Sequence, residues 1–184
     1  LGWPVVLSAM LGIGLGLSSD NQGDSRFGLR GTYDQTWVNS LGAEWSNVLT
    51  FGNAPSLHSE LYQPLDLDRA VFVAPFLDLS LSPDSVFFED QRVARYDVMQ
   101  GRVGADLGTT WHGLEVRAGV YYGQTEITLD TGSPQLPEER ITDSGLRARL
   151  LYEPLARAGA PRSGTRGSLE TRSPLRVMGA EVDY

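Results

Sequence analysis

The stretch Leu114-Glu-Val-Arg-Ala-Gly-Val-Tyr-Tyr122 carries apolar side chains at every second position, with Glu115 and Arg117 between them. Successive side chains of a β-strand point to opposite faces, so this period of two residues predicts a strand with one apolar and one charged face. The same alternation begins at Leu11, where glycines fill the gaps, and it recurs almost to the C-terminus. The chain is therefore expected to be built from strands throughout.

The alternation predicts about nine strands in an all-β, antiparallel up-and-down arrangement. They are expected near residues 11–18, 26–37, 43–51, 56–65, 70–81, 93–108, 114–129, 144–155 and 165–177. Residues 1–10 are expected to form an irregular N-terminal segment. Residues 11–184 are expected to form one β-barrel portion, because no linker divides them.

The connections between these strands alternate in length. Tight turns are expected at 39–42, 66–69 and 112–113, and long or polar joints at 19–25, 83–91 and 130–141, with the short joint 52–55 as an exception. Tight turns at one end and extended loops at the other are typical of outer-membrane barrels.

Composition is compatible with such a barrel and excludes a bundle of membrane-spanning helices. The chain of 184 residues is 41% hydrophobic, with a mean hydropathy of -0.20. A transmembrane barrel tolerates this low value because only alternate residues meet lipid. A soluble antiparallel sheet also alternates, but several expected strands exceed the roughly 9 to 11 residues that cross a bilayer, which favours the membrane barrel.

Charge and cysteine content exclude other classes of protein. The net charge is -8 and no basic stripe is present, which argues against nucleic acid as a partner. All basic residues are arginine, whose guanidinium pairs bidentately with carboxylates. The chain has no cysteine, so disulfides and thiolate metal sites are excluded.

Charged residues on the face opposite the apolar one are the best functional candidates, because rings of charge tune what passes through a pore. The alternative is a salt-bridge network that fills the lumen. The candidates are Arg30, Glu44, Arg102, Asp106, Glu115, Arg117, Arg147 and Arg149. Aromatic residues near strand ends are expected to form interfacial girdles; these are Trp37, Phe51, Tyr62, Trp111, Tyr121, Tyr122 and Tyr152.

The sequence motifs do not support a catalytic site. The chain has no Gly-x-Ser-x-Gly nucleophile elbow. Asp130-Thr-Gly-Ser133 and Asp143-Ser-Gly145 resemble aspartic-protease loops, but they flank one expected loop and lack the two lobes of such enzymes.

Metal sites are not expected either. His58 and His112 lack zinc-ligand spacing, while Asp66 and Asp68 with Asp78, or Glu89 with Asp90, fit solvated charges better than a calcium site. No catalytic, cofactor-binding or metal-binding residue is predicted, and no cofactor.

Several runs resemble a known family. They are Gly14-Leu-Gly-Leu-Ser-Ser-Asp20, Phe27-Gly-Leu-Arg-Gly-Thr-Tyr33, Trp37-Val-Asn-Ser-Leu-Gly-Ala-Glu-Trp45, Tyr62-Gln-Pro-Leu-Asp66 and Phe72-Val-Ala-Pro75. Together they resemble the C-terminal barrel of bacterial patatin-like phospholipases of the PlpD type, and Pro161-Arg-Ser-Gly-Thr165 is similar to a periplasmic turn of those barrels. The resemblance implies the BamA/TamA superfamily (bacterial surface antigen domain). Its barrels have about sixteen strands and follow periplasmic POTRA domains, with a patatin hydrolase domain further upstream.

The resemblance implies that the chain is the N-terminal portion of such a barrel, ending near 179–184, in the bacterial outer membrane. Its expected role is to anchor or assist periplasmic POTRA and patatin domains, in contact with outer-membrane lipid, with a second copy in a homodimer as a further candidate partner. No enzyme activity is expected within the chain itself, since a hydrolase would need the upstream domain. The alternative is a small self-contained barrel of about eight to ten strands that acts as a pore or adhesin.

Overall fold

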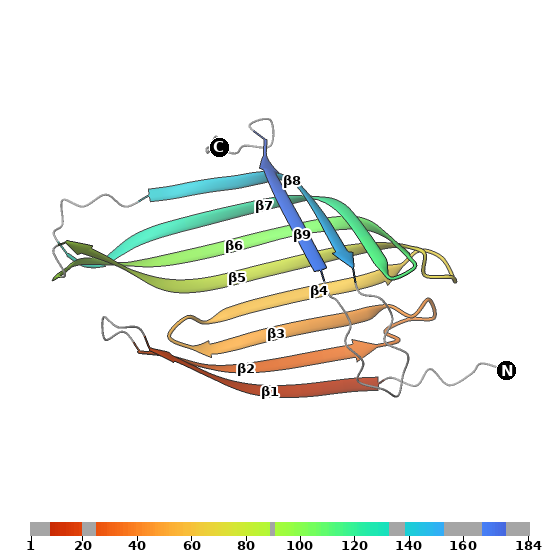
Figure 1. Ribbon diagram of the computed structural model, residues 1–184, viewed down its shortest axis with the longest axis horizontal. Helices are drawn as coiled ribbons and strands as arrows, with labels where there is room; N and C mark the ends of the chain where they lie inside the picture. Colours follow the sequence, from red (N-terminus) through yellow and green to blue (C-terminus); the bar gives the residue numbers. More distant parts are fainter. Residues whose placement is uncertain (1–7, 20–24, 89–90, 133–138, 153–166, 176–184) are drawn as a thin grey trace.

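The alternating pattern produces strands in every part of the chain that the computed structural model describes, residues 8–19, 25–88, 91–132, 139–152 and 167–175. The strands are β1 (Ser8–Ser19), β2 (Ser25–Thr36), β3 (Glu44–Gly52), β4 (Ser56–Pro64), β5 (Val71–Phe88), β6 (Gln91–Trp111), β7 (Leu114–Thr131), β8 (Glu139–Tyr152) and β9 (Gly167–Pro174). Each pairs antiparallel with the next, giving one sheet in the order β1 to β9 (Figure 1). The predicted all-β, up-and-down fold is confirmed. Within the described ranges there is no helix that is long and apolar enough to span a membrane.

The sheet is open and curled. In the described residues β1 and β9 are its two edges, and Figure 1 shows β9 crossing in front of β6 and β7. Arg117 on β7 donates a hydrogen bond of 2.8 Å to Glu60 on β4, three strands away. Side chains from strands this far apart meet only on the inside of a curve, so this contact identifies the concave face.

The two faces differ in chemistry. Residues directly opposite each other in antiparallel strands share a face, which places Leu49, Leu57 and Leu79 in one convex row. The convex face exposes large apolar side chains on every strand from β1 to β9 except β4, where Leu57 and Leu61 are half-buried. The concave face buries Phe72, Phe76, Asp106, Tyr121 and Arg147 instead. The buried centre of the sheet is therefore partly charged.

The predicted tight turns are confirmed. His112 and Gly113 have φ of 50° and 81°, which is the pattern of a two-residue type I′ hairpin turn. In the β4–β5 turn the Asp66 carboxylate accepts a 2.8 Å hydrogen bond from the Ala70 amide. In the β2–β3 turn the Asn39 side-chain oxygen accepts one of 3.0 Å from the Leu41 amide.

Two of the predicted long joints are shorter than predicted, because the strands continue into them. β5 runs to Phe88 and β6 begins at Gln91, so most of 83–91 is strand. β8 begins at Glu139 rather than at residue 144, which shortens the joint predicted at 130–141. Strand β1 begins at Ser8, so residues 8–10 of the predicted irregular segment are strand, and residues 1–7 lie outside the described residues.

Pro83 accounts for the difference between the joint predicted at 83–91 and the observed strand. The Leu81 amide donates to the carbonyl of Pro55, so this side of β5 faces β4. The nitrogen of Pro83, two residues on, points the same way, but the β4–β5 ladder ends at the pair Ser56 and Ser80. Pro83 therefore sits where a strand needs no amide donor on that side.

Candidate functional site on the concave face

The charged residues predicted to face a lumen all lie on the concave face, as the strand register shows. The structure pairs two couples from within the set, Asp106 with Arg147 and Glu115 with Arg117. Glu44 and Arg102 pair with residues outside the set, Arg69 and Asp143. Arg30 and Arg149 share the face but form no ion pair with other described residues.

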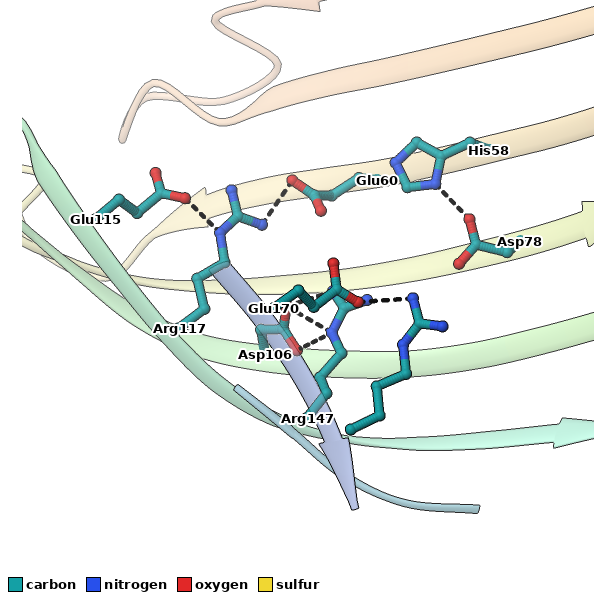
Figure 2. A network of polar contacts seen from close by, with 9 residues as sticks. His58, Glu60, Asp78, Asp106, Glu115, Arg117, Arg147 and Glu170 are labelled. Atoms are coloured by element: carbon teal, nitrogen blue, oxygen red, sulfur yellow. Dashed lines mark hydrogen bonds and ion pairs between the residues drawn. The ribbon is translucent and has the colours of Figure 1, made fainter. Parts of the chain in front are cut away.

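The most buried pair joins β6 to β8 across β7. The Asp106 side chain is 0% exposed and that of Arg147 is 7% exposed. Arg147 Nε lies 2.7 and 3.0 Å from the two carboxylate oxygens of Asp106, and Nη2 donates a further hydrogen bond to Oδ2 (Figure 2). Gly119 stands between them in the register, and a Cβ there would collide with the Asp106 carboxylate. The absence of a side chain at Gly119 on β7 lets the ion pair form between β6 and β8.

Phenylalanine rings from β5 complete this arrangement. The ring of Phe76 covers Gly104, where a Cβ would collide with it, and the Arg147 guanidinium carbon lies 3.6 Å from the ring centre. Arginine over an aromatic face gains electrostatic attraction, and more when water is excluded. The arrangement recurs four residues away, where Phe72 covers Gly108 and Arg117 lies 5.1 Å from the ring centre.

Arg117 connects distant parts of the sheet. Its Nη1 lies 2.8 Å from Glu60 on β4, and its Nε lies 2.5 Å from Glu115 on its own strand (Figure 2). The side chains of these residues are 9%, 15% and 18% exposed. The pairing holds β4 and β7 in the curved arrangement.

A third group lies further along the same face. Arg102 approaches Asp143 at 3.4 Å across Gly123, and the Tyr121 hydroxyl donates a 2.8 Å hydrogen bond to the other Asp143 oxygen. The Arg102 side chain is only 10% exposed, and its Nε has no hydrogen-bond partner within the described part of the chain. In the same row His58 Nδ1 lies 2.5 Å from Asp78 (Figure 2).

Sequence reasoning missed several members of this network. Glu60 lies two residues after His58, so strand alternation places both on one face, and this signal could have found it. Asp143 was interpreted as part of a protease-like triplet beside a loop, whereas it lies within β8. The sequence favours a solvated charge at Asp78, whereas the structure pairs it with His58. The pairing of Arg117 with Glu60 depends on the curl of the sheet, which no local pattern reports.

The other motifs are not brought together into a site. Asp130 lies 3.7 Å from Arg95, and Asp143 is held by Arg102, so different arginines hold the two protease-like carboxylates. His112 lies in the β6–β7 turn. Among the described residues there is no cluster of three or more His, Cys, Asp or Glu side chains able to hold a metal ion. Ser133, Glu89 and Asp90 lie outside the described residues.

The predicted aromatic girdle needs a correction. Exposed rings include Trp37, Phe51, Trp111, Tyr122 and Tyr152, and Trp45 joins them. Tyr62 and Tyr121 lie on the concave face instead. Tyr62 packs on Phe72 with ring centres 4.3 Å apart, and Tyr121 is buried beside Asp143. Tyr121 and Tyr122 are consecutive, so they necessarily point to opposite faces.

The concave face therefore carries carboxylates and guanidiniums that mainly neutralise one another. This favours a salt-bridge network over a row of free charges lining a pore. Comparison of the chain with protein-family models, curated proteins and solved structures finds no match.

Proposed function

We propose that this chain forms part of the wall of a bacterial outer-membrane β-barrel, with its convex face against lipid and its concave face lining the lumen. Its role would be to anchor or assist a periplasmic domain, as the resemblance to PlpD-type barrels implies, with any hydrolase activity in that other domain. The observation that carries this proposal is the contrast between the faces. Large apolar side chains are exposed on the convex face, and buried ion pairs lie on the concave one.

The height of the apolar zone supports a membrane setting. On β7 the convex face is apolar from Leu114 to Tyr122, and the next convex residue is Gln124. This zone agrees with the roughly 9 to 11 residues of a strand that crosses a bilayer. Trp45, Trp111 and Tyr152 lie at its tight-turn end, and Trp111 is 69% exposed. Exposed aromatic rings at one level are typical of membrane interfaces.

The number of described strands weighs against a barrel closed by these strands alone. Neighbouring strands alternate in direction, so β1 and β9 run the same way. Closing nine strands would then pair β1 with β9 in parallel, whereas bacterial single-chain barrels have an even number of antiparallel strands. Additional strands, odd in number, would restore antiparallel closure. The nine described strands alone therefore do not form a closed antiparallel barrel.

Consecutive residues on opposite faces provide the test of membrane orientation. The chain has no cysteine, so Leu79→Cys and Ser80→Cys each give one labelling site, convex and concave respectively. Each variant of the full chain is folded into phospholipid vesicles and labelled with a nitroxide. The label at 79 should collide with lipid-soluble oxygen and be shielded from a water-soluble nickel complex, while the label at 80 should not show this preference. Equal nickel accessibility at both positions would overturn the proposal.

The family part of the proposal has a separate test. The gene sequence on both sides of this segment should encode an upstream patatin nucleophile elbow and further alternating strands downstream. Flanking sequence without either would contradict the anchoring role and leave the orientation test unaffected.

A further inference from the structure

The chemistry of the two faces inverts along the long strands β6 and β7. Near the tight turns, the convex residues of β7 are apolar. Beyond Tyr122 they are Gln124, Glu126 and Thr128. The paired register of β6 and β7 continues without a shift from Tyr96 to Trp111, so these polar residues remain on the convex side. The apolar residues of this part have therefore moved to the concave face.

The concave face here carries an apolar stripe, which we define as Tyr96, Val98, Ile127, Leu129 and Ile141. Val98 stands opposite Ile127 and Tyr96 opposite Leu129, so the stripe follows the β6–β7 pair. Ile141 continues it on β8. All five residues are half-buried rather than buried. This part of the concave face thus leaves apolar surface accessible, unlike the ion-paired region closer to the tight turns.

Carboxylates flank the stripe on both sides. Asp84 on β5 stands opposite Tyr96, and Glu139 on β8 stands opposite Ile127. Both are exposed, and neither has an ion-pair partner among the described residues. Neighbouring strands lie about 4.8 Å apart, so β5 and β8 are separated by about 14 Å across the stripe. An α-helix with its side chains is about 10 to 12 Å wide.

We propose that the apolar stripe binds a cationic amphipathic helix from a partner polypeptide. The apolar side of such a helix would cover Val98 and Ile127, and basic side chains on its two flanks would meet Asp84 and Glu139. Charge complementarity favours this partner over an acidic or uncharged one, because both flanks are acidic and the whole chain has a net charge of -8. The inversion does not depend on the convex face meeting lipid, so this inference stands apart from the proposed function.

The test uses the full chain folded in zwitterionic detergent micelles and a fluorescent peptide of about 14 residues, long enough as a helix to cover the stripe. The peptide contains leucine and lysine in helical periodicity, and a matched peptide carries glutamate in place of lysine. The lysine peptide should bind saturably and the glutamate peptide should not. The double variant Asp84→Asn/Glu139→Gln should weaken binding about tenfold. The control Glu126→Gln, which removes a charge from the opposite face, should leave binding unchanged.

Two single-cysteine variants locate the bound peptide. Val98→Cys lies in the stripe, and its neighbour Met99→Cys lies on the convex face. With a dye on the cysteine and a quencher on the peptide, position 98 should be quenched and position 99 should not. No saturable binding, equal effects of Glu126→Gln and the double variant, or stronger quenching at 99 would each overturn the proposal. So would equal binding of the glutamate peptide, or dye–dye contact at 98 between two copies of the chain without peptide.

Discussion

Replacing Arg147 with methionine measures what the buried ion pair contributes to the sheet. The substitution leaves the Asp106 carboxylate, 0% exposed, without the guanidinium that meets both of its oxygens. Removing one partner of a buried pair costs about 3 to 5 kcal/mol, because the remaining charge is uncompensated. Methionine keeps an adaptable apolar side chain over the ring of Phe76, so lost packing accounts for little of this cost. We expect the free energy of unfolding to fall by about 3 to 5 kcal/mol.

The double variant Asp106→Leu/Arg147→Met separates the cost of leaving one buried charge unpaired from the cost of losing the ion pair itself. Leucine has the branching of aspartate and removes the buried charge, and replacing both partners of a buried pair by apolar residues is often close to neutral. The double variant should therefore be within about 1.5 kcal/mol of the parent, while each single variant is several kcal/mol less stable. The coupling energy of the double-mutant cycle should then be at least about 4 kcal/mol.

Urea unfolding of the micelle-bound chain, followed by tryptophan fluorescence and extrapolated linearly to water, supplies these free energies. The matched control is Arg172→Met, because Arg172 and Glu170 form an exposed pair at 42% and 35%. Exposed pairs contribute about 0 to 1 kcal/mol. If Arg147→Met costs no more than Arg172→Met, the pair is not dehydrated as described and the reasoning is refuted.

Three further substitutions test other parts of the structure. Gly119→Ala should destabilise the fold by about 1 to 3 kcal/mol in the same unfolding assay, because the added Cβ has no room. The control Gly14→Ala, whose Cβ would have its nearest neighbouring atom at 4.0 Å, should be close to neutral. Equal effects of the two substitutions would contradict the need for a glycine at position 119. Val120→Arg should cost about 2 to 4 kcal/mol in vesicle assembly, because it would place a guanidinium in lipid, while Arg149→Leu should have little effect, and equal losses would count against the assignment of faces. His112→Asn should stabilise the hairpin by about 0.5 kcal/mol in urea unfolding, because Asn-Gly is favoured in a type I′ turn; a loss of stability would argue against that turn type.

The local pattern predicts the strands well because each strand of a two-faced sheet must alternate to satisfy two environments. Leu114 to Tyr122 shows this in the sequence alone, and all nine predicted strands are present. Strand ends are harder to predict. Pro83 looks like a loop residue, and only the end of the β4–β5 ladder explains why a strand tolerates it.

The pairing on the concave face is less predictable than the face itself. Alternation places Arg117 on the charged side, but its partner Glu60 lies 57 residues earlier and three strands away. That contact depends on the curvature of the sheet. The neighbouring pair depends on Gly119, whose missing side chain lets Arg147 reach Asp106 across β7. Arg147 and Arg149 share this face, and Arg147 neutralises the buried carboxylate of Asp106.

The inversion of the two faces appears in the sequence as a change in which alternate positions are apolar. On β7 the apolar residues are even-numbered up to Tyr122, and odd-numbered at Ile127 and Leu129. In an isolated strand such a change suggests a bulge, which would restore the apolar residues to one face. The β6–β7 register has no shift in this interval, so the backbone continues and the two faces exchange their chemistry instead. A sheet that leaves lipid for water should turn polar residues outward at the boundary, and its apolar residues then need cover on the inside.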